Sequence, residues 1–158
     1  MPKVIIHDRL WQEEEVDASE LVFRPSVYGV LVENGKVLLS KQWDGYDWPG
    51  GGVDIHETIE QALKREFWEE TGLKVEPQQI LLADSVFYKN RNGGKWNMVA
   101  IYYQCKKIAG DLSIANITGD ENNYIDMPEW IDLEEAKKLK FYNSSDNVKL
   151  IEEVKKFL

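Results

Sequence analysis

Short runs of apolar residues, several of them rich in branched and aromatic side chains, dominate the first part of the chain. Residues 21–23 and 27–32 have this character, and residues 36–39 continue it after Asn34 and Gly35. An Asn-Gly pair between two such runs is the strongest short signal for a β-hairpin, because both turn positions tolerate positive φ. The pattern therefore predicts two or three strands with a tight turn at residues 34–35.

The spacing of apolar residues changes to a helical period over residues 59–71. Thr58 can cap this helix, with Gln61 three residues later completing a capping box, and Gly72 supplies a residue that ends it. At 100° per residue the apolar side chains form one stripe, made of Ile59, Ala62, Leu63 and Phe67. This stripe predicts a helix packed on a sheet.

The second half of the chain predicts further strands and two short helices. Residues 80–88 and 96–105 are expected to be long strands, and residues 124–131 another. Asp132 can cap a short helix with Glu135 at its third position. An amphipathic C-terminal helix is marked by Val148, Ile151, Val154 and Phe157. Hairpins exclude a purely parallel sheet, so we expect an α/β protein with a mixed sheet flanked by helices, forming one domain over residues 1–158.

Charge and cysteine content narrow the classes of function. Lys and Arg number 19 and Asp and Glu 28 in 158 residues, giving a net charge of −9. Such a chain is a poor candidate for binding nucleic acid or an anionic membrane by charge. A single cysteine, Cys105, excludes an intramolecular disulfide and a multi-cysteine zinc site. There is no signal-type stretch and no apolar run of about 18 residues, so we expect a cytoplasmic protein.

Glutamates occupy the apolar side of the predicted helix. Glu66 and Glu70 fall within the apolar stripe and Glu69 lies at its edge. Burying unpaired carboxylates is costly, like charges four residues apart repel, and the helix dipole disfavours anions near the C-terminus. A divalent cation would reverse all three effects. Carboxylates without nearby His or Cys favour a hard cation, so Mg²⁺ or Mn²⁺ is expected.

A glycine-rich turn precedes this helix at residues 50–52. Glycine brings bare backbone close to a ligand, and the turn can lend a carbonyl or amide groups to the same place. The turn, the capped helix and the carboxylates together predict a site for a metal and a pyrophosphate. Hydrolysis by water that the metal activates is the matching chemistry.

The spacing of these residues resembles the Nudix box, Gly-x5-Glu-x7-Arg-Glu-aliphatic-x-Glu-Glu-x-Gly-aliphatic. Gly51, Glu57 and the run Arg65-Glu66-Phe67-Trp68-Glu69-Glu70-Thr71-Gly72-Leu73 match each fixed Gly, Glu and Arg of that pattern. The one departure is Phe67 in an aliphatic position. The segments at residues 48–50 and 129–133 are also family-like, so the resemblance extends over nearly the whole chain.

The resemblance implies an α/β/α sandwich that hydrolyses a nucleoside diphosphate linked to another group, using Mg²⁺ or Mn²⁺. Metal ligands would be Glu66, Glu69 and Glu70, joined by the Gly51 carbonyl. A supporting salt bridge between Glu57 and Arg65 would fix the glycine-rich loop against the helix.

The general base is left open between two places in the chain. Family members use either a glutamate of the box or an acidic residue on a later loop. Glu66, together with Glu69, is the candidate in the box, and Glu121, which precedes the Trp130 segment, is the candidate outside it.

Further residues are expected to contact the substrate or a partner. Trp43 and Tyr88 are candidates for stacking on a base, and Lys41 for neutralising a phosphate. Trp68 faces away from the carboxylates and suggests a covering layer or a subunit contact, as in a homodimer.

The leading hypothesis is a pyrophosphohydrolase acting on a small nucleotide: a nucleoside triphosphate, a nucleotide sugar such as ADP-ribose or a dinucleoside polyphosphate. The alternative is a non-catalytic nucleotide-sensing module on the same fold, which the complete set of glutamates disfavours.

Overall fold

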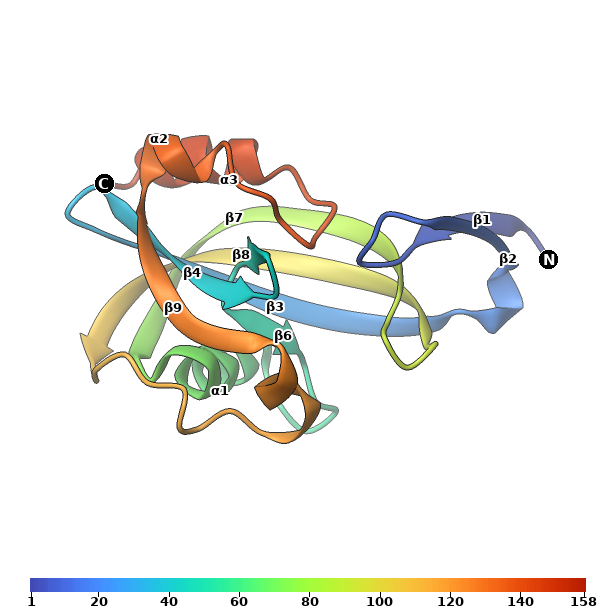
Figure 1. Ribbon diagram of the computed structural model, residues 1–158, viewed down its shortest axis with the longest axis horizontal. Helices are drawn as coiled ribbons and strands as arrows, with labels where there is room; N and C mark the ends of the chain where they lie inside the picture. The colour runs from blue at the N-terminus through green and yellow to red at the C-terminus, as the bar shows by residue number, and fades with distance from the viewer.

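The computed structural model describes all of residues 1–158 and shows one extended sheet with helices on both sides (Figure 1). The strands are β1 (Lys3–His7), β2 (Glu13–Asp17), β3 (Val22–Glu33), β4 (Lys36–Gln42), β5 (Gly45–Asp47), β6 (Gly50–Gly52), β7 (Lys74–Lys89), β8 (Lys95–Ala109) and β9 (Ile125–Asp132). The helices are α1 (Ile59–Thr71), α2 (Leu133–Ala136) and α3 (Asn147–Lys155), with short 3₁₀ turns η1 (Ala18–Glu20) and η2 (Gly119–Asn123). None of these helices has an apolar stretch long enough to cross a membrane.

The sheet is mixed, as predicted. Its strand order is β2-β1-β7-β8-β3-β4-β5, with β6 paired to β3 and β9 paired to β4. Strands β3 and β8 run parallel through a long register, and β7 and β8 form a long antiparallel hairpin. In Figure 1, α1 lies on one side of the curled sheet and α2 and α3 lie on the other. The expected α/β/α arrangement is therefore confirmed.

Two hydrophobic cores hold the layers together. One joins α1 to the sheet and contains Leu63 and Phe67 from the helix with Val27 and Leu31 from β3. The other packs α2 and α3 on the opposite side, around Trp48, whose side chain is almost completely buried. Each side of the sheet thus has its own apolar contact with a helix, which fixes α1 in position beside β6.

Local signals in the sequence predicted the turn and the helix ends correctly. Asn34 and Gly35 both have positive φ, 52° and 74°, in the β3–β4 turn. Thr58 and Gln61 form the reciprocal capping box of α1, and Gly72 ends the helix in the left-handed conformation.

Several features differ from the sequence prediction. Residues 22–23 and 27–32 belong to one continuous strand, β3, which begins after Leu21, and Gly50–Gly52 form strand β6 rather than a turn. The antiparallel β1–β2 hairpin was not predicted, because its strands are short and rich in charged residues. In α3, Val148 is exposed and Phe157 lies beyond the helix, while Leu150 is buried instead. The apolar side of α3 is therefore formed by Leu150, Ile151 and Val154.

Candidate active site

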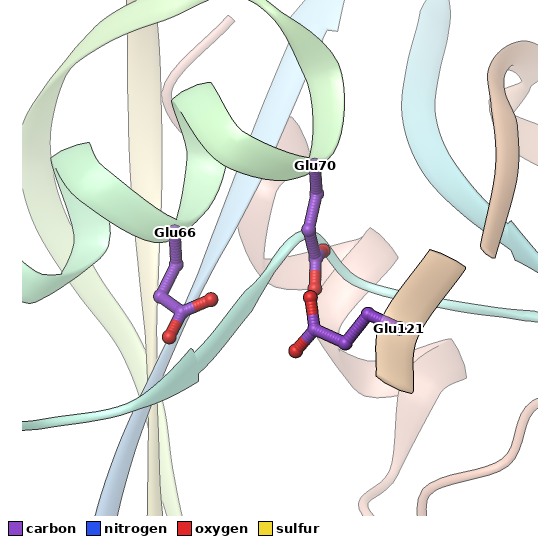
Figure 2. A group of neighbouring side chains, drawn as sticks. All are labelled: Glu66, Glu70 and Glu121. Atoms are coloured by element: carbon purple, nitrogen blue, oxygen red, sulfur yellow. The ribbon is translucent and has the colours of Figure 1, made fainter. Parts of the chain in front are cut away.

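Three carboxylates from two distant segments meet beside β6. Glu66 and Glu70 project from successive turns of α1, and Glu121 comes from η2. One oxygen atom from each lies within 4.8 Å of the others. Figure 2 shows Glu70 and Glu121 pointing toward each other, with Glu66 one helical turn away. The loop before β9 therefore completes a cluster that the helix begins.

The cluster is largely buried, and among its three carboxylates only Glu66 has an ion pair, with Arg65. Glu66 is 8% exposed and Glu70 is 3% exposed. Burial raises the pKa of Glu66 to about 7 and that of Glu70 well above its usual value. Burial, followed by the charge of Glu69, also raises the pKa of Glu121. The Oε2 atoms of Glu66 and Glu121 are buried without any hydrogen-bond partner.

The glycine-rich strand β6 forms the wall against which the carboxylates pack. A Cβ atom on Gly51 would lie 2.6 Å from the carboxyl carbon of Glu66, so no larger residue fits at this position without displacing it. The Gly50 amide donates a hydrogen bond to Glu70 Oε2 at 3.2 Å. Pairing of Gly51 with Val27 of β3 holds this backbone in place.

Arg65 organises the neighbouring carboxylates. Its guanidinium donates to Glu57 at 2.7 and 2.8 Å and to the Gly52 carbonyl oxygen at 3.2 Å. It also reaches Glu66 Oε1 at 2.9 Å and Glu69 Oε2 at 3.5 Å. The hydrogen bonds from Arg65 lower the pKa of Glu57 to about 2. The Glu57–Arg65 ion pair thus ties the loop before α1 to the helix and to β6.

A cavity of about 300 Å³ opens beside the cluster. Gly51, Glu70 and Glu121 line one part of it, and Trp43 and Tyr88 line another. The Trp43 ring stacks on Tyr124 with ring centroids 4.3 Å apart. The two aromatic residues proposed from the sequence for base stacking therefore lie in the same cavity as the carboxylates.

Lys41 is placed elsewhere. Its ammonium lies over the Tyr46 ring, 4.5 Å from the centroid, and Lys41 is not among the residues that line the cavity. Neighbouring residues of a strand face opposite sides, and Gln42 is the β4 residue that lines the cavity. The role of Lys41 in binding a phosphate stays a prediction.

A cation that the sequence analysis missed does line the cavity. The Arg24 guanidinium lies 4.1 Å from the centroid of the Trp96 ring and packs directly against Gly52. Arg24 is in no salt bridge of the protein, although its charge acts to lower the pKa of Glu121. No motif marks Arg24, since its position depends on the pairing of β3 with β6 and β8.

The fold and the carboxylate cluster together define a class of hydrolase, and comparison with known proteins agrees. The family model described as "NUDIX domain" matches residues 22–153. The chain belongs to the Nudix family. The match begins after β2, so the β1–β2 hairpin lies outside it.

Relatives show how far the similarity extends. A MutT-like protein of Streptomyces ambofaciens is 39% identical over 88 residues, which cover 54% of this chain and 53% of the relative. An RNA pyrophosphohydrolase of Aeromonas hydrophila is 44% identical over 73 residues, covering 44% of this chain and 41% of the relative. The chain thus spans about half the length of the curated relatives it matches.

Solved structures share the fold at lower identity. The MutT protein of Methanosarcina mazei superposes with a TM-score of 0.65 at 20% identity, covering 87% of this chain and 97% of the other. An ADP-ribose pyrophosphatase of Streptococcus suis gives a TM-score of 0.59 at 17% identity, covering 82% and 90%.

Proposed function

We propose that this protein is a divalent-cation-dependent pyrophosphohydrolase that cleaves a nucleoside diphosphate linked to another group. The observation that carries the proposal is the convergence of Glu66, Glu70 and Glu121, of which Glu70 and Glu121 line an aromatic-lined cavity. Such a site offers negative charge for a cation and flat apolar surfaces for a base.

The residues present fit a hard divalent cation. Two buried carboxylate oxygens, Glu66 Oε2 and Glu121 Oε2, have no partner within the protein and are free to act as ligands. All donors are oxygen atoms, which favours Mg²⁺ or Mn²⁺ over zinc. Glu69, which contacts Arg65 only at 3.5 Å, and the Gly51 carbonyl are proposed as further ligands at the edge of the cluster. A cation bound there would neutralise phosphate oxygens and make water a better nucleophile.

The proposed reaction is the hydrolysis of a phosphoric anhydride. The water oxygen forms a bond to phosphorus, the bridging P–O bond breaks, and the departing phosphate takes up the bond's electron pair. A carboxylate accepts the proton that water loses. The proposed acceptor is whichever of Glu66 and Glu121 does not hold the cation, with Glu69 beside them, because both offer a buried Oε2 without a hydrogen-bond partner.

Arg24 is proposed to replace Lys41 as the cation that receives a substrate phosphate. It lines the cavity, packs against Gly52 and has no anionic partner. A guanidinium suits a phosphate because it donates two parallel hydrogen bonds. This arrangement gives a protein of net charge −9 a local positive group where an anionic substrate must enter.

The substrate class includes nucleoside triphosphates, nucleotide sugars and dinucleoside polyphosphates. Relatives named RNA pyrophosphohydrolase add triphosphorylated RNA to the compounds to test. The cytoplasmic location, the single domain and the homodimer predicted from the sequence stay predictions.

The direct test is a screen of the purified protein with Mg²⁺ against these four classes, with identification of the products. We expect hydrolysis of at least one anhydride, abolished by EDTA. Calorimetry with a non-hydrolysable nucleotide should show binding in Mg²⁺ and much weaker binding in EDTA, since the bare carboxylates repel phosphate. Binding without turnover of any compound would instead support a nucleotide-sensing module. Equal affinity in EDTA and Mg²⁺ would contradict the placement of phosphate at the carboxylates.

A further inference from the structure

The cavity has a second wall, made by the β1–β2 hairpin rather than by the matched domain. His7, the last residue of β1, lines the cavity and pairs with Tyr88 of β7. In Figure 1 the hairpin lies at the end of the molecule opposite to α1, with its turn directed back toward the sheet's centre. A part of the chain outside the family match therefore contributes to the pocket.

The sheet order gives the scale of this pocket. From β6 the path to β1 crosses β3, β8 and β7. Neighbouring strands lie about 4.8 Å apart, so four spacings give about 19 Å across the sheet, and the registers add an offset along the strands because Gly51 lies level with Ala83 and His7 with Tyr88. Both His7 and Gly51 line the same cavity, so an extended ligand is needed to contact both. A ligand whose phosphates contact the carboxylates would place its other end near His7.

The hydrogen bonding of the His7 ring determines what it offers a ligand. Nδ1 lies 3.0 Å from the backbone carbonyl oxygen of Asp8. A carbonyl only accepts, so Nδ1 must carry the proton, and in the neutral ring Nε2 is left as an acceptor. Nε2 is buried and has no partner. An unmade hydrogen bond at such an atom is unfavourable, and a ligand that donates to it would satisfy the atom.

Hydrogen bonds and ring stacking within the turn orient the His7 ring. Asp8 Oδ1 accepts hydrogen bonds from the amides of Leu10 and Gln12, and the Trp11 amide donates to the Asp8 carbonyl. Trp11 is held at φ 63°, a left-handed conformation that is strained for a bulky residue. Its ring stacks on His7 at 4.5 Å with an interplanar angle of 14°. The strained residue thus fixes the plane of the imidazole.

The same turn contacts the opposite wall of the cavity. The Arg9 guanidinium lies 4.5 Å from the centroid of Trp43. Tyr88 meets the other side of His7 edge-on, with centroids 5.7 Å apart, and also packs near Trp96. The His7 ring thus lies among aromatic side chains, which suit a flat heterocycle better than a sugar.

We infer that His7 recognises the base of the substrate by accepting, at Nε2, a hydrogen bond from an exocyclic amine. The inference rests on the proposed function, which places the phosphates of the ligand at the carboxylates and its base near His7. Access to Nε2 requires the turn at residues 8–12 to shift, and β1 is joined to β7 at a single register pair. Bases with an amine gain this hydrogen bond, and otherwise identical bases without the amine do not.

The test uses nucleosides, which carry no phosphate and so do not depend on the carboxylates. Three pairs differ only in the amine: adenosine and purine riboside, guanosine and inosine, cytidine and zebularine. The chain has two histidines, so His56→Phe assigns the imidazole ¹⁵N signals and serves as a control at an exposed position. We expect one amine-bearing nucleoside to move the His7 Nε2 signal upfield, and its partner without the amine to leave it in place.

Substitutions of His7 test whether binding of the base determines which nucleotide is hydrolysed. His7→Phe keeps a ring under Trp11 but removes the acceptor, so kcat/KM for the amine-bearing nucleotide should fall about 3- to 10-fold, mainly through KM. The nucleotide without the amine should be unaffected. His7→Gln restores an acceptor and should recover part of the preference.

Hydrolysis and base recognition can fail separately in this design. A His7 signal that moves while no compound is hydrolysed would retain the base site and contradict the proposed hydrolase. Hydrolysis with no movement of the signal, or equal movement by both members of every pair, would overturn the role of His7. Movement by ribose 5-phosphate but by no nucleoside would overturn the assignment to a base.

Discussion

The carboxylates at the two edges of α1 occupy opposite electrostatic environments. Glu57, just before the helix, receives two hydrogen bonds from Arg65, and its pKa is lowered to about 2. Glu70, in the last turn, is almost completely buried and receives only the Gly50 amide, and its pKa is raised well above the usual value. The two residues lie on either side of Arg65 in the chain; Arg65 donates to Gly52 of β6, and Glu70 accepts from Gly50 of the same strand.

Glu66 lies between these two environments and shows what separates them. Its Oε1 accepts a hydrogen bond from Arg65 at 2.9 Å, whereas its Oε2 has no partner. Arg65 therefore donates hydrogen bonds to Glu57 and to Oε1 of Glu66. Glu70 and Oε2 of Glu66 receive no hydrogen bond from a positively charged side chain. Arg65 is the cation on the side of Glu57, where it ties the loop to the helix. On the side of Glu70 no side chain supplies a cation, and there we propose that a divalent cation binds.

The largest effect is expected from Glu70→Gln. This change removes a negative charge from the carboxylates that lack a cationic partner and keeps the shape of the side chain. Turnover should fall about 100-fold or more, because loss of even a supporting contact to a metal ligand costs 10- to 100-fold. Stability without metal should be unchanged or higher, since a buried repulsion is removed. Turnover under limiting Mg²⁺ and thermal unfolding in EDTA measure the two effects.

Glu60→Gln is the matched control on the same helix, because Glu60 is exposed in its first turn. Glu69→Gln should also lower turnover if Glu69 is a ligand. Near-normal activity of either Glu69→Gln or Glu70→Gln at limiting Mg²⁺ would remove that residue from the proposed ligands.

The second prediction concerns stability against pH without metal. Glu66 titrates near its usual value of 4.5 when unfolded and at about 7 when folded. Between these values the folded protein binds more protons than the unfolded chain, so the free energy of unfolding must decrease as pH rises. The shift of Glu66 alone corresponds to about 3 kcal/mol. Glu70 and Glu121 shift in the same direction, and their groups face Glu66 across the cluster.

Denaturant unfolding in EDTA at pH 5 and pH 8 measures this slope. Mg²⁺ should restore stability at pH 8, because the cation replaces the protons. Glu57 has a lowered pKa and contributes the opposite slope, but only below about pH 4.5, outside this window. A free energy of unfolding in EDTA that rises from pH 5 to pH 8 would show that the carboxylates of the cluster are not held without a cationic partner.

The sequence predicted the paired and unpaired glutamates of α1 because both follow from local spacing. Helical periodicity places Glu66 and Glu70 on the side of Leu63, and the cap at Thr58 fixes where the helix begins. Such signals need only residues within a few turns of one another. The β3–β4 hairpin at Asn34 was predictable for the same reason.

The rest of the pocket depends on contacts between distant segments, which a single sequence does not show. Arg24 reaches Gly52 only because β3 pairs with β6, and His7 reaches the cavity through its pairing with Tyr88. Glu121 was a candidate from its place before β9, but its approach to Glu70 is visible only in the folded chain. Lys41 was chosen from its place on a strand, and the sequence did not show that Gln42, rather than Lys41, lines the cavity.

The smallest effect is expected from Arg65→Ala, which breaks the ion pair between Arg65 and Glu57. The change leaves Glu57 without its partner and removes a donor from the Gly52 carbonyl, so stability in Mg²⁺ should fall by about 2 kcal/mol. Turnover should fall about 10-fold, because β6 and Glu66 lose a positioning contact. Arg65→Lys retains the charge but not the paired hydrogen bonds and should be intermediate.

A charge-swapped variant separates the ion pair from the rest of the Arg65 contacts. Glu57→Arg/Arg65→Glu restores opposite charges across the same gap and should recover part of the lost stability. It should not recover turnover, because a glutamate at position 65 adds negative charge beside Glu66 and Glu69, where Arg65 now lies 2.9 and 3.5 Å from their oxygens. An unchanged melting temperature for Arg65→Ala would show that the pair does not hold the loop, and the contrast between the two sides of α1 would then concern charge alone.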